Sequence, residues 1–538
     1  MKLPTQSPKA VQSAPSKYGC LIANMILMIP SQRPRESPFS PAWSSAAAWA
    51  RERALALLLC LCLAAYLAAL GAYYVGYFND DAFYIIGARS LLQGRFAELN
   101  APGAPPLGAY LPGYPLLLSP WIGLFPWTFL PCQLFSIAMV LLALQQSWEL
   151  FSDDAPPGIR SAALILAGLN PLTVSLSGTV LSDPAYLCAG VLIFRSIKKR
   201  WDSESPSDWM PVAGLCAGAA YLRPTGAVFL IALCAALALQ KRPRTAALCA
   251  AVGTLLILPW LLRNLALRGY AVSYLAEFPR DPAQIAAGAL SSSRFFLEGL
   301  YARTFLRCSS FGHGIPLLVS IAGLALTLLG WSRTRLRAFS GAYAGLYFAV
   351  LTAWGKPSER YLLPLLPFAA VWLLLGVRCV AQSLRRSPAF AVLLIIAAAA
   401  VLDFPVIAGV VRDARAQDTA RTRPSRAYDW IRAHTGTEEV FAAESDARLH
   451  LLTGRRCIRL PREGSPRLLF DALRSRGVRW VLLLPTGDSL MRDPEDPNAP
   501  ADPHRIRALL QSSPRTEIVF EDSAEGAVIL RLPPSPSF

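Results

Sequence analysis

Residues 54–75 read ALALLLCLCLAAYLAALGAYYV, an apolar run that directly follows the basic residues Arg51 and Arg53. A helix of this length crosses the hydrocarbon core of a bilayer, which is about 30 Å thick. Similar apolar runs recur as far as residue 411. We expect eleven membrane spans, at residues 54–75, 129–150, 161–180, 184–198, 210–222, 225–240, 245–263, 313–331, 338–354, 361–378 and 388–411.

The composition of the whole chain agrees with a membrane protein. Its 538 residues are 54% hydrophobic and 16% charged, whereas a soluble globular protein carries about 25% charged residues. So few charges in so long a chain leave much apolar surface that cannot face water. This excludes a cytosolic enzyme, and also a collagen-like or coiled-coil chain.

The formal net charge of +17 is concentrated in the part that carries the apolar runs. Residues 413–538 contain 19 Arg, no Lys and 18 Asp and Glu, so +16 of the +17 belongs to residues 1–412. Basic clusters in short loops between spans are expected on the cytoplasmic side. The clusters are Arg195, Lys198, Lys199 and Arg200; Lys241, Arg242 and Arg244; Arg333, Arg335 and Arg337; and Arg378, Arg385 and Arg386. They lack interleaved aromatic residues and match no nucleic-acid module, so nucleic acid is excluded as a partner.

Eleven crossings with a cytoplasmic N-terminus place all of these clusters in the cytoplasm. Residues 1–50, rich in Ser, Pro and Ala, are predicted to be a disordered cytoplasmic tail. Residues 51–412 are predicted to be an all-α polytopic membrane domain with an outer loop at 76–128. The apolar stretch 114–127 in that loop contains three prolines, and we interpret it as an interfacial or re-entrant segment.

Residues 413–538 have a higher share of charged residues, and helical and strand-like stretches alternate in them. They are predicted to be a small soluble α/β domain outside the cytoplasm. Helices are expected at 425–434, 467–476 and 505–511, and strands at 439–443, 478–484, 516–521 and 527–532. The whole arrangement predicts a multi-pass protein of the cell inner membrane with a periplasmic C-terminal domain.

The outer loop begins with residues 77–94, YFNDDAFYIIGARSLLQG. Asp80 and Asp81 lie where the chain leaves the membrane, and an amphipathic helix that ends at Gly94 follows them along the surface. A carboxylate at the mouth of a membrane cavity can act as a general base or bind a cation. The alternative is that Asn79 or Asp80 only caps the helix. Neighbouring side chains diverge by about 100° on a helix, so one carboxylate can cap while the other reacts.

Another outer-face carboxylate, Asp183, lies in a turn between two spans and precedes Pro184. It either caps the next helix or converges with Asp80 on one cavity. Four basic residues also fall on the outer side, against the positive-inside tendency: Arg223, Arg263, Lys356 and Arg360. Such residues bind phosphate at the headgroup level through charge-assisted hydrogen bonds. The alternative is that they snorkel to headgroups without a specific ligand.

Several short motifs occur in the order typical of one family. They are DDAFY at 80–84, ARSLLQG at 88–94, YLPGYPLLL at 110–118, LSDP at 181–184, LRPTG at 222–226, PWLLRN at 259–264, RYLLPLLP at 360–367, YDWIRAHT at 428–435 and LTGR at 452–455. Together they resemble the GT-C membrane glycosyltransferases, in the branch that holds protein O-mannosyltransferases and the lipid A aminoarabinose transferase. The likeness covers most of residues 54–460.

This resemblance implies a sugar donor linked to polyprenyl phosphate and a lipid, glycan or protein acceptor on the outer face. Asp80 matches the family's catalytic base, which would deprotonate the acceptor hydroxyl so that it attacks the anomeric carbon with inversion. Asp81 stands where the family often has Glu, and Asp183 matches a second acidic position that orients substrate or a metal. Arg223, Arg263, Lys356 and Arg360 would hold the lipid phosphate. No cofactor is required, while a divalent cation stays open. The rival hypotheses are a lipid or solute transporter and an inactive relative that binds the lipid carrier.

Overall fold

The computed structural model describes residues 41–267, 281–308, 314–355, 357–416, 425–461, 465–484, 503–511 and 516–533. Residues 53–538 form one compact unit. The first helix, α2 (Pro41–Ala69), begins before this unit. Residues 41–50 were predicted to belong to the disordered tail and are helical instead, because proline suits a first helical position and the alanines after it favour a helix. Residues 1–40 of the predicted tail lie outside the described residues.

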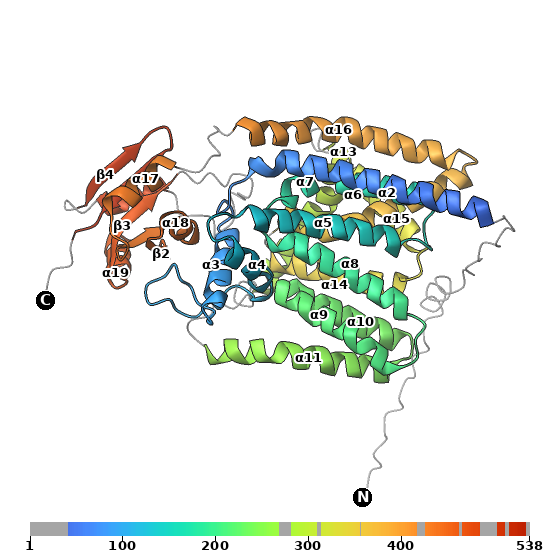
Figure 1. Cartoon of the computed structure of the whole chain (residues 1–538), viewed down its shortest axis with the longest axis horizontal. Helices are drawn as coiled ribbons and strands as arrows, with labels where there is room; N and C mark the ends of the chain where they lie inside the picture. Colours follow the sequence, from blue (N-terminus) through green and yellow to red (C-terminus); the bar gives the residue numbers. More distant parts are fainter. Residues whose placement is uncertain are drawn as a thin grey trace, which may run out of the picture. The chain divides into compact units, whose positions relative to one another are not determined.

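Helices make up the first four fifths of the chain (Figure 1). The first group contains α3 (Asp80–Leu92), α4 (Gly113–Leu124), α5 (Leu130–Leu150), α6 (Pro157–Gly168), α7 (Pro171–Ser177), α8 (Ser182–Arg200), α9 (Met210–Leu222), α10 (Ala227–Leu239) and α11 (Pro243–Ala266). The second contains α12 (Pro282–Glu298), the π-helix η5 (Gly299–Phe305), α13 (Ile315–Trp331), α14 (Arg337–Trp354), α15 (Leu366–Ser383) and α16 (Pro388–Ala416). Short 3-10 helices are η1 (Leu70–Ala72), η2 (Pro206–Trp209), η3 (Pro224–Gly226) and η6 (Glu359–Leu365).

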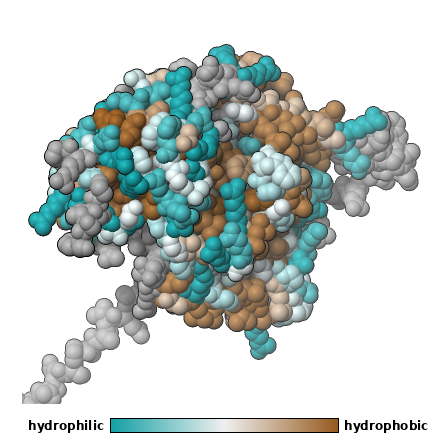
Figure 2. Space-filling view, turned by 60° about the vertical axis from the view of Figure 1, so that its left-hand side comes forward, coloured by the Kyte–Doolittle hydropathy of each residue, from teal (hydrophilic) through white to brown (hydrophobic). Residues whose placement is uncertain are grey.

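Every predicted span contains a helix, but fewer of these helices are long enough to cross a membrane alone. Five helices qualify by length and composition within the described residues, and six if the bent pair α6 and α7 counts as one span. That pair bends by 60° because Asn170 leaves the helical conformation and accepts a hydrogen bond from the Leu172 N–H, after which Pro171 starts α7. Figure 2 shows broad hydrophobic patches on the surface, and exposed residues such as Leu255, Leu318 and Phe404 supply the apolar face that a bilayer needs.

Two segments that were predicted to lie outside the membrane-spanning helices are helical. The predicted interfacial stretch 114–127 forms α4, whose 12 residues are too few to span a bilayer and which packs against α3. Residues 282–305 were predicted to be loop and form α12 and η5. An N-cap starts α12, since the Asp281 carboxylate accepts a hydrogen bond from the Ala283 N–H at 3.0 Å and Pro282 follows it.

Close packing holds the helices together. Helices α13 and α15 cross at Gly330 and Gly376, where an added Cβ would lie within 2 Å of a backbone oxygen of the other helix. An aromatic core joins α8, α10 and α14: the rings of Phe229 and Tyr343 stack with centroids 4.1 Å apart, and Phe194 lies edge-on to Tyr343. This core packs α8, α10 and α14 against one another.

The C-terminal region is an α/β domain, as predicted. It contains α17 (Ser425–His434), β1 (Val440–Ala443), α18 (Asp446–Thr453), β2 (Arg456–Arg459), α19 (Pro466–Arg474), β3 (Val478–Leu483), α20 (Pro503–Gln511), β4 (Glu517–Asp522) and β5 (Ala527–Arg531). The sheet order is β2-β1-β3-β5-β4. Strands β1, β2 and β3 run parallel, and β5 pairs antiparallel with both β3 and β4. The sequence did not predict α18 and β2, because the four residues of β2 begin and end with Arg and α18 is only eight residues long.

Candidate active site

Asp80 begins helix α3, and its carboxylate faces two polar side chains from other parts of the chain. The Tyr110 hydroxyl donates to Oδ1 at 2.9 Å, and Arg360 Nη2 donates to Oδ2 at 3.0 Å. The Asp80 side chain is 30% exposed, so it stays accessible to a substrate. Asn79 makes no capping hydrogen bond through its side chain, and the donors to the Asp80 carboxylate are the Tyr110 and Arg360 side chains, not backbone N–H groups of α3. The capping alternative is therefore wrong for both residues.

Asp81 has a different environment and is fully buried. Its carboxylate accepts hydrogen bonds from the Tyr73 hydroxyl at 2.5 Å, from the Gly76 N–H at 2.6 Å and from the Ala82 N–H at 3.0 Å. Burial raises the pKa of Asp81 to about 6, against the lowering effect of these hydrogen bonds. A carboxyl group enclosed in this way shapes the turn before α3 and cannot touch a substrate.

Asp183 lies in the first turn of α8, almost fully buried, and forms an ion pair with Arg223. Arg223 follows the last residue of α9 in an extended conformation, as a residue before proline prefers. The turn that continues into α10 is tight, because a Cβ on Gly226 would lie 2.1 Å from the Ala219 oxygen. The LRPTG motif thus turns the chain so that Arg223 meets Asp183.

The arginines of the two Asp–Arg pairs both lie beside the ring of Tyr361. The guanidinium carbons of Arg223 and Arg360 lie 5.1 and 5.3 Å from the centroid of the Tyr361 ring. Tyr347 fixes the η6 turn by donating to the Tyr361 carbonyl at 3.0 Å. Within the described part of the chain, Arg360 Nε is buried and has no hydrogen-bond partner. Arg360 therefore has one N–H donor that these residues leave unused.

The opposite side is closed by Tyr84, whose hydroxyl lies 3.2 Å from Ser182 Oγ and whose ring lies edge-on to Tyr110 at 5.5 Å. A closed ring of contacts results, which we call the Asp80 ring. Its members are Asp80, Tyr110, Tyr84, Ser182, Asp183, Arg223, Tyr361 and Arg360. The ring connects Asp183 to Asp80, and each carboxylate is paired with its own guanidinium group, Asp80 with Arg360 and Asp183 with Arg223.

Two predicted phosphate ligands are not seen in this ring. Arg263 donates to the backbone oxygens of Leu107 and Phe96, both at 3.1 Å, and lies 4.7 Å from the Trp260 ring centroid. Its guanidinium group braces the outer loop beside the isolated bridge between Ala97 and Pro106. Lys356 lies outside the described residues.

The sequence analysis also missed four members of the ring: Tyr84, Tyr110, Ser182 and Tyr361. Each lies inside a motif already recognised. Ser182 and Tyr361 adjoin a charged residue, whereas Tyr84 and Tyr110 have no charged neighbour in the sequence and nothing local marked them. In the described ranges, no three His, Cys, Asp or Glu side chains are grouped so as to hold a metal ion.

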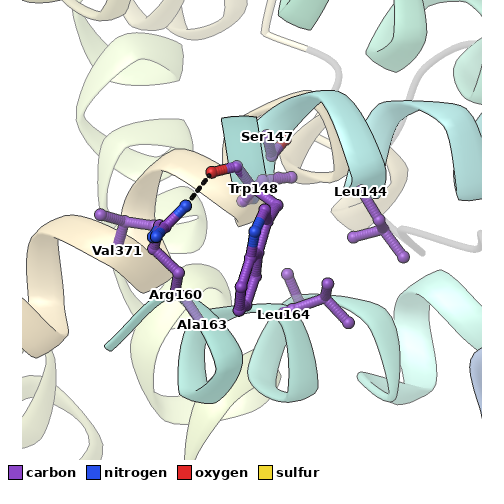
Figure 3. A pocket seen from close by; sticks show the side chains of 9 residues that line it. Leu144, Ser147, Trp148, Arg160, Ala163, Leu164 and Val371 are labelled. Atoms are coloured by element: carbon purple, nitrogen blue, oxygen red, sulfur yellow. Dashed lines mark hydrogen bonds between the residues drawn. The ribbon is translucent and has the colours of Figure 1, made fainter. Parts of the chain in front are cut away.

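A cavity between α5, α6 and α15 lies near the C-terminal end of α5 (Figure 3). Arg160 Nη1 donates to the Trp148 oxygen there at 3.0 Å, and its guanidinium carbon lies 4.6 Å from the Trp148 ring centroid. The rest of the wall is mainly aliphatic, from residues such as Leu144, Leu164 and Val371. The cavity lacks carboxylates, which separates it from the Asp80 ring.

No protein-family model matches the sequence, and no curated protein matches it either. Solved structures do match, and they give the chain the fold of the GT-C membrane glycosyltransferases, which confirms the resemblance seen in the sequence.

The similar structures include ArnT, a lipid A aminoarabinose transferase, from Cupriavidus metallidurans in the apo state. The identity is 12% and the TM-score 0.56, with 90% of this chain and 98% of that chain covered. The same ArnT bound to undecaprenyl phosphate matches with 12% identity and a TM-score of 0.54, over 88% of this chain and 97% of that one. The archaeal oligosaccharyltransferase AglB from Archaeoglobus fulgidus, in complex with an inhibitory peptide and a dolichol-phosphate, matches with 13% identity and a TM-score of 0.50, over 79% and 69%.

Proposed function

We propose that the protein is an integral membrane glycosyltransferase that moves a hexose or pentose from a polyprenyl-phosphate carrier to an acceptor on the outer face of the membrane. The observation that carries the proposal is the contact of Asp80 with Arg360 inside the Asp80 ring. It places a part-exposed carboxylate beside a cation that has an unused donor. Support for the carrier comes from the fold shared with ArnT, one structure of which is bound to undecaprenyl phosphate.

The ring suits an inverting displacement. A donor phosphate would bind Arg360 and Arg223, which draws Arg360 away from Asp80 and leaves that carboxylate free as a base. Asp80 then accepts the proton of the acceptor hydroxyl, and the oxygen bonds to the anomeric carbon on the face opposite the phosphate. The bond from that carbon to the phosphate oxygen breaks, and the polyprenyl phosphate leaves with the electron pair. Arg360 and Arg223 stabilise the growing charge on the phosphate.

The test uses the full-length protein and a panel of undecaprenyl-phosphoryl hexoses and pentoses, with lipid, glycan and peptide acceptors. At least one donor should be consumed, with undecaprenyl phosphate released and the anomeric configuration inverted in the product. Parallel reactions with EDTA determine whether a divalent cation takes part. Binding of undecaprenyl phosphate without turnover would identify an inactive relative, and neither binding nor turnover would refute the proposal.

We further propose that the chain crosses the inner membrane eleven times, with the C-terminal domain in the periplasm. Basic clusters lie together at the ends of helices away from the Asp80 ring, where Lys198 pairs with Asp153 at 3.0 Å and Arg335 pairs with Asp202. Positive loops of this kind favour the cytoplasmic side.

A reporter fused to the C-terminus should therefore be active when it requires export, as alkaline phosphatase does. The same reporter inserted after Arg385, in the loop between α15 and α16, should be inactive. The opposite pattern, or activity at both sites, would overturn the proposed orientation.

A further inference from the structure

The residue before Asp80 is held by the C-terminal domain. Asn79 has a positive φ of 60° with a ψ of −40°, which lies outside the regular helical and extended conformations. Its side chain extends to α18 instead of capping α3. Asn79 Nδ2 donates to Asp446 Oδ1 at 3.4 Å, and Asn79 Oδ1 accepts from the Arg448 N–H at 3.3 Å.

A second asparagine from the outer loop binds the same carboxylate. Asn100 is fully buried, and its Nδ2 donates to Asp446 Oδ2 at 3.0 Å. The Asn100 carbonyl accepts from the Cys457 N–H at 2.7 Å, so the outer loop continues the hydrogen bonding of the edge strand β2. Asp446 is thus shared by two amides that lie on either side of helix α3 in the sequence.

Apolar packing accompanies these hydrogen bonds. Ala447 of α18 is fully buried against Ala82 and Ile86 of α3. On the other side of Asn79, Arg448 Nη1 donates to the Tyr74 hydroxyl at 3.0 Å. Helix α18 therefore contacts the chain both before and after Asp80.

The position of Asp446 in the sheet is informative. It follows β1 at the carboxyl end of the parallel strands β2, β1 and β3, the edge at which open α/β sheets usually bind ligands. Here Asn79 and Asn100 of the outer loop bind Asp446 beyond the carboxyl end of β1. Arg455, just after α18, connects this helix to the end of α17. Its Nη2 donates to the carbonyls of Arg432 and Thr435. This contact joins the YDWIRAHT and LTGR motifs.

We infer that the C-terminal domain sets the position of the Asp80 carboxylate through Asn79, Asp446 and Asn100, so that Asp446 is a positioning residue for proton transfer. The inference rests on the proposed role of Asp80 as the base. Asp446 is buried away from water, which supports the inference. The same burial raises the pKa of this carboxyl to about 6. A base displaced by about 1 Å can slow a reaction by about 100-fold while donor binding is unchanged.

The first experiment compares Asp446→Ala with Glu439→Ala, a control at the other end of β1 that pairs with Arg479 at 2.8 Å. With the undecaprenyl-phosphoryl donor that the wild type uses best, Asp446→Ala should lower kcat by about 10- to 100-fold. Its KM for the donor and its affinity for undecaprenyl phosphate should stay within about 3-fold of wild type. Glu439→Ala should match wild type. A normal kcat, or a loss confined to KM, would overturn the inference.

Asn79→Gly removes the same contact from the side of the membrane domain and replaces Asp446→Ala if that variant fails to fold. Glycine tolerates the positive φ of this position. Hydrogen–deuterium exchange provides a readout that needs no substrate. Amides of residues 77–84 should exchange about 10-fold faster in Asp446→Ala and Asn79→Gly, and at the wild-type rate in Glu439→Ala. Unchanged exchange would refute the contact even in an active enzyme. A wild type that uses no donor would refute the proposed function and the positioning role that rests on it, while the exchange rates would still decide whether the contact holds the segment before α3.

Discussion

Replacing Asp80 by Asn should lower kcat by about 10²- to 10⁴-fold, the range that a positioned general base typically contributes. Asparagine has nearly the same shape and can still accept the Tyr110 hydrogen bond, but it cannot take a proton from the acceptor hydroxyl. Donor binding should persist, because the predicted phosphate contacts belong to Arg223 and Arg360. The measurement is single-turnover transfer from the preferred undecaprenyl-phosphoryl donor, with undecaprenyl phosphate affinity determined on the same preparation.

Asp81→Asn is a matched comparison, since it makes the same chemical change one residue later. Two donors face Asp81 Oδ2 and one faces Oδ1, so an amide NH₂ would oppose at least one of them at a cost of about 1–3 kcal/mol in stability. The main effect of Asp81→Asn should therefore be a lower melting temperature. The kcat of the folded fraction should fall far less than in Asp80→Asn. Equal rates for Asp80→Asn and wild type would show that Asp80 is not the base.

The helical fold could be predicted because a long apolar run in a bilayer satisfies its backbone hydrogen bonds by forming a helix. The sequence also pointed to Asp80, since it lies five residues after the end of the first predicted span. It did not distinguish the part-exposed carboxylate of Asp80 from the buried carboxylate of Asp81. That difference depends on Tyr73 and Gly76 around Asp81, and on Arg360, which is 280 residues from Asp80.

The arginines that were predicted to lie on the outer face illustrate the same limit. Arg263 and Arg360 occur in similar settings, beside prolines and large apolar residues at the end of a span. Backbone carbonyls of the outer loop surround Arg263, whereas the Asp80 carboxylate and the Tyr361 ring surround Arg360. These neighbours come from distant segments, so no local pattern separates the two residues. The same applies to α18, which is short and gains its importance from docking on α3.

The second large effect is expected on the binding of undecaprenyl phosphate when Arg360 is replaced. Arg360→Met should weaken the binding of undecaprenyl phosphate and lower kcat/KM by about 100-fold, because it removes charge-assisted hydrogen bonds worth about 1.5–3 kcal/mol and leaves Asp80 without its cation. Arg360→Lys should recover part of this loss, since lysine keeps the charge but not the planar donor fork.

Arg263→Met is the matched control, because it removes the same side chain from another outer-face position. Its contacts to Phe96 and Leu107 brace a loop, so we expect lower thermal stability and undecaprenyl phosphate affinity within about 3-fold of wild type. Titration with undecaprenyl phosphate separates the two outcomes. If Arg263→Met abolishes binding while Arg360→Met binds normally, the phosphate lies beside the outer loop and not in the Asp80 ring. In that case Arg360 serves only as the counterion of Asp80, and the mechanism loses the group that stabilises the leaving phosphate.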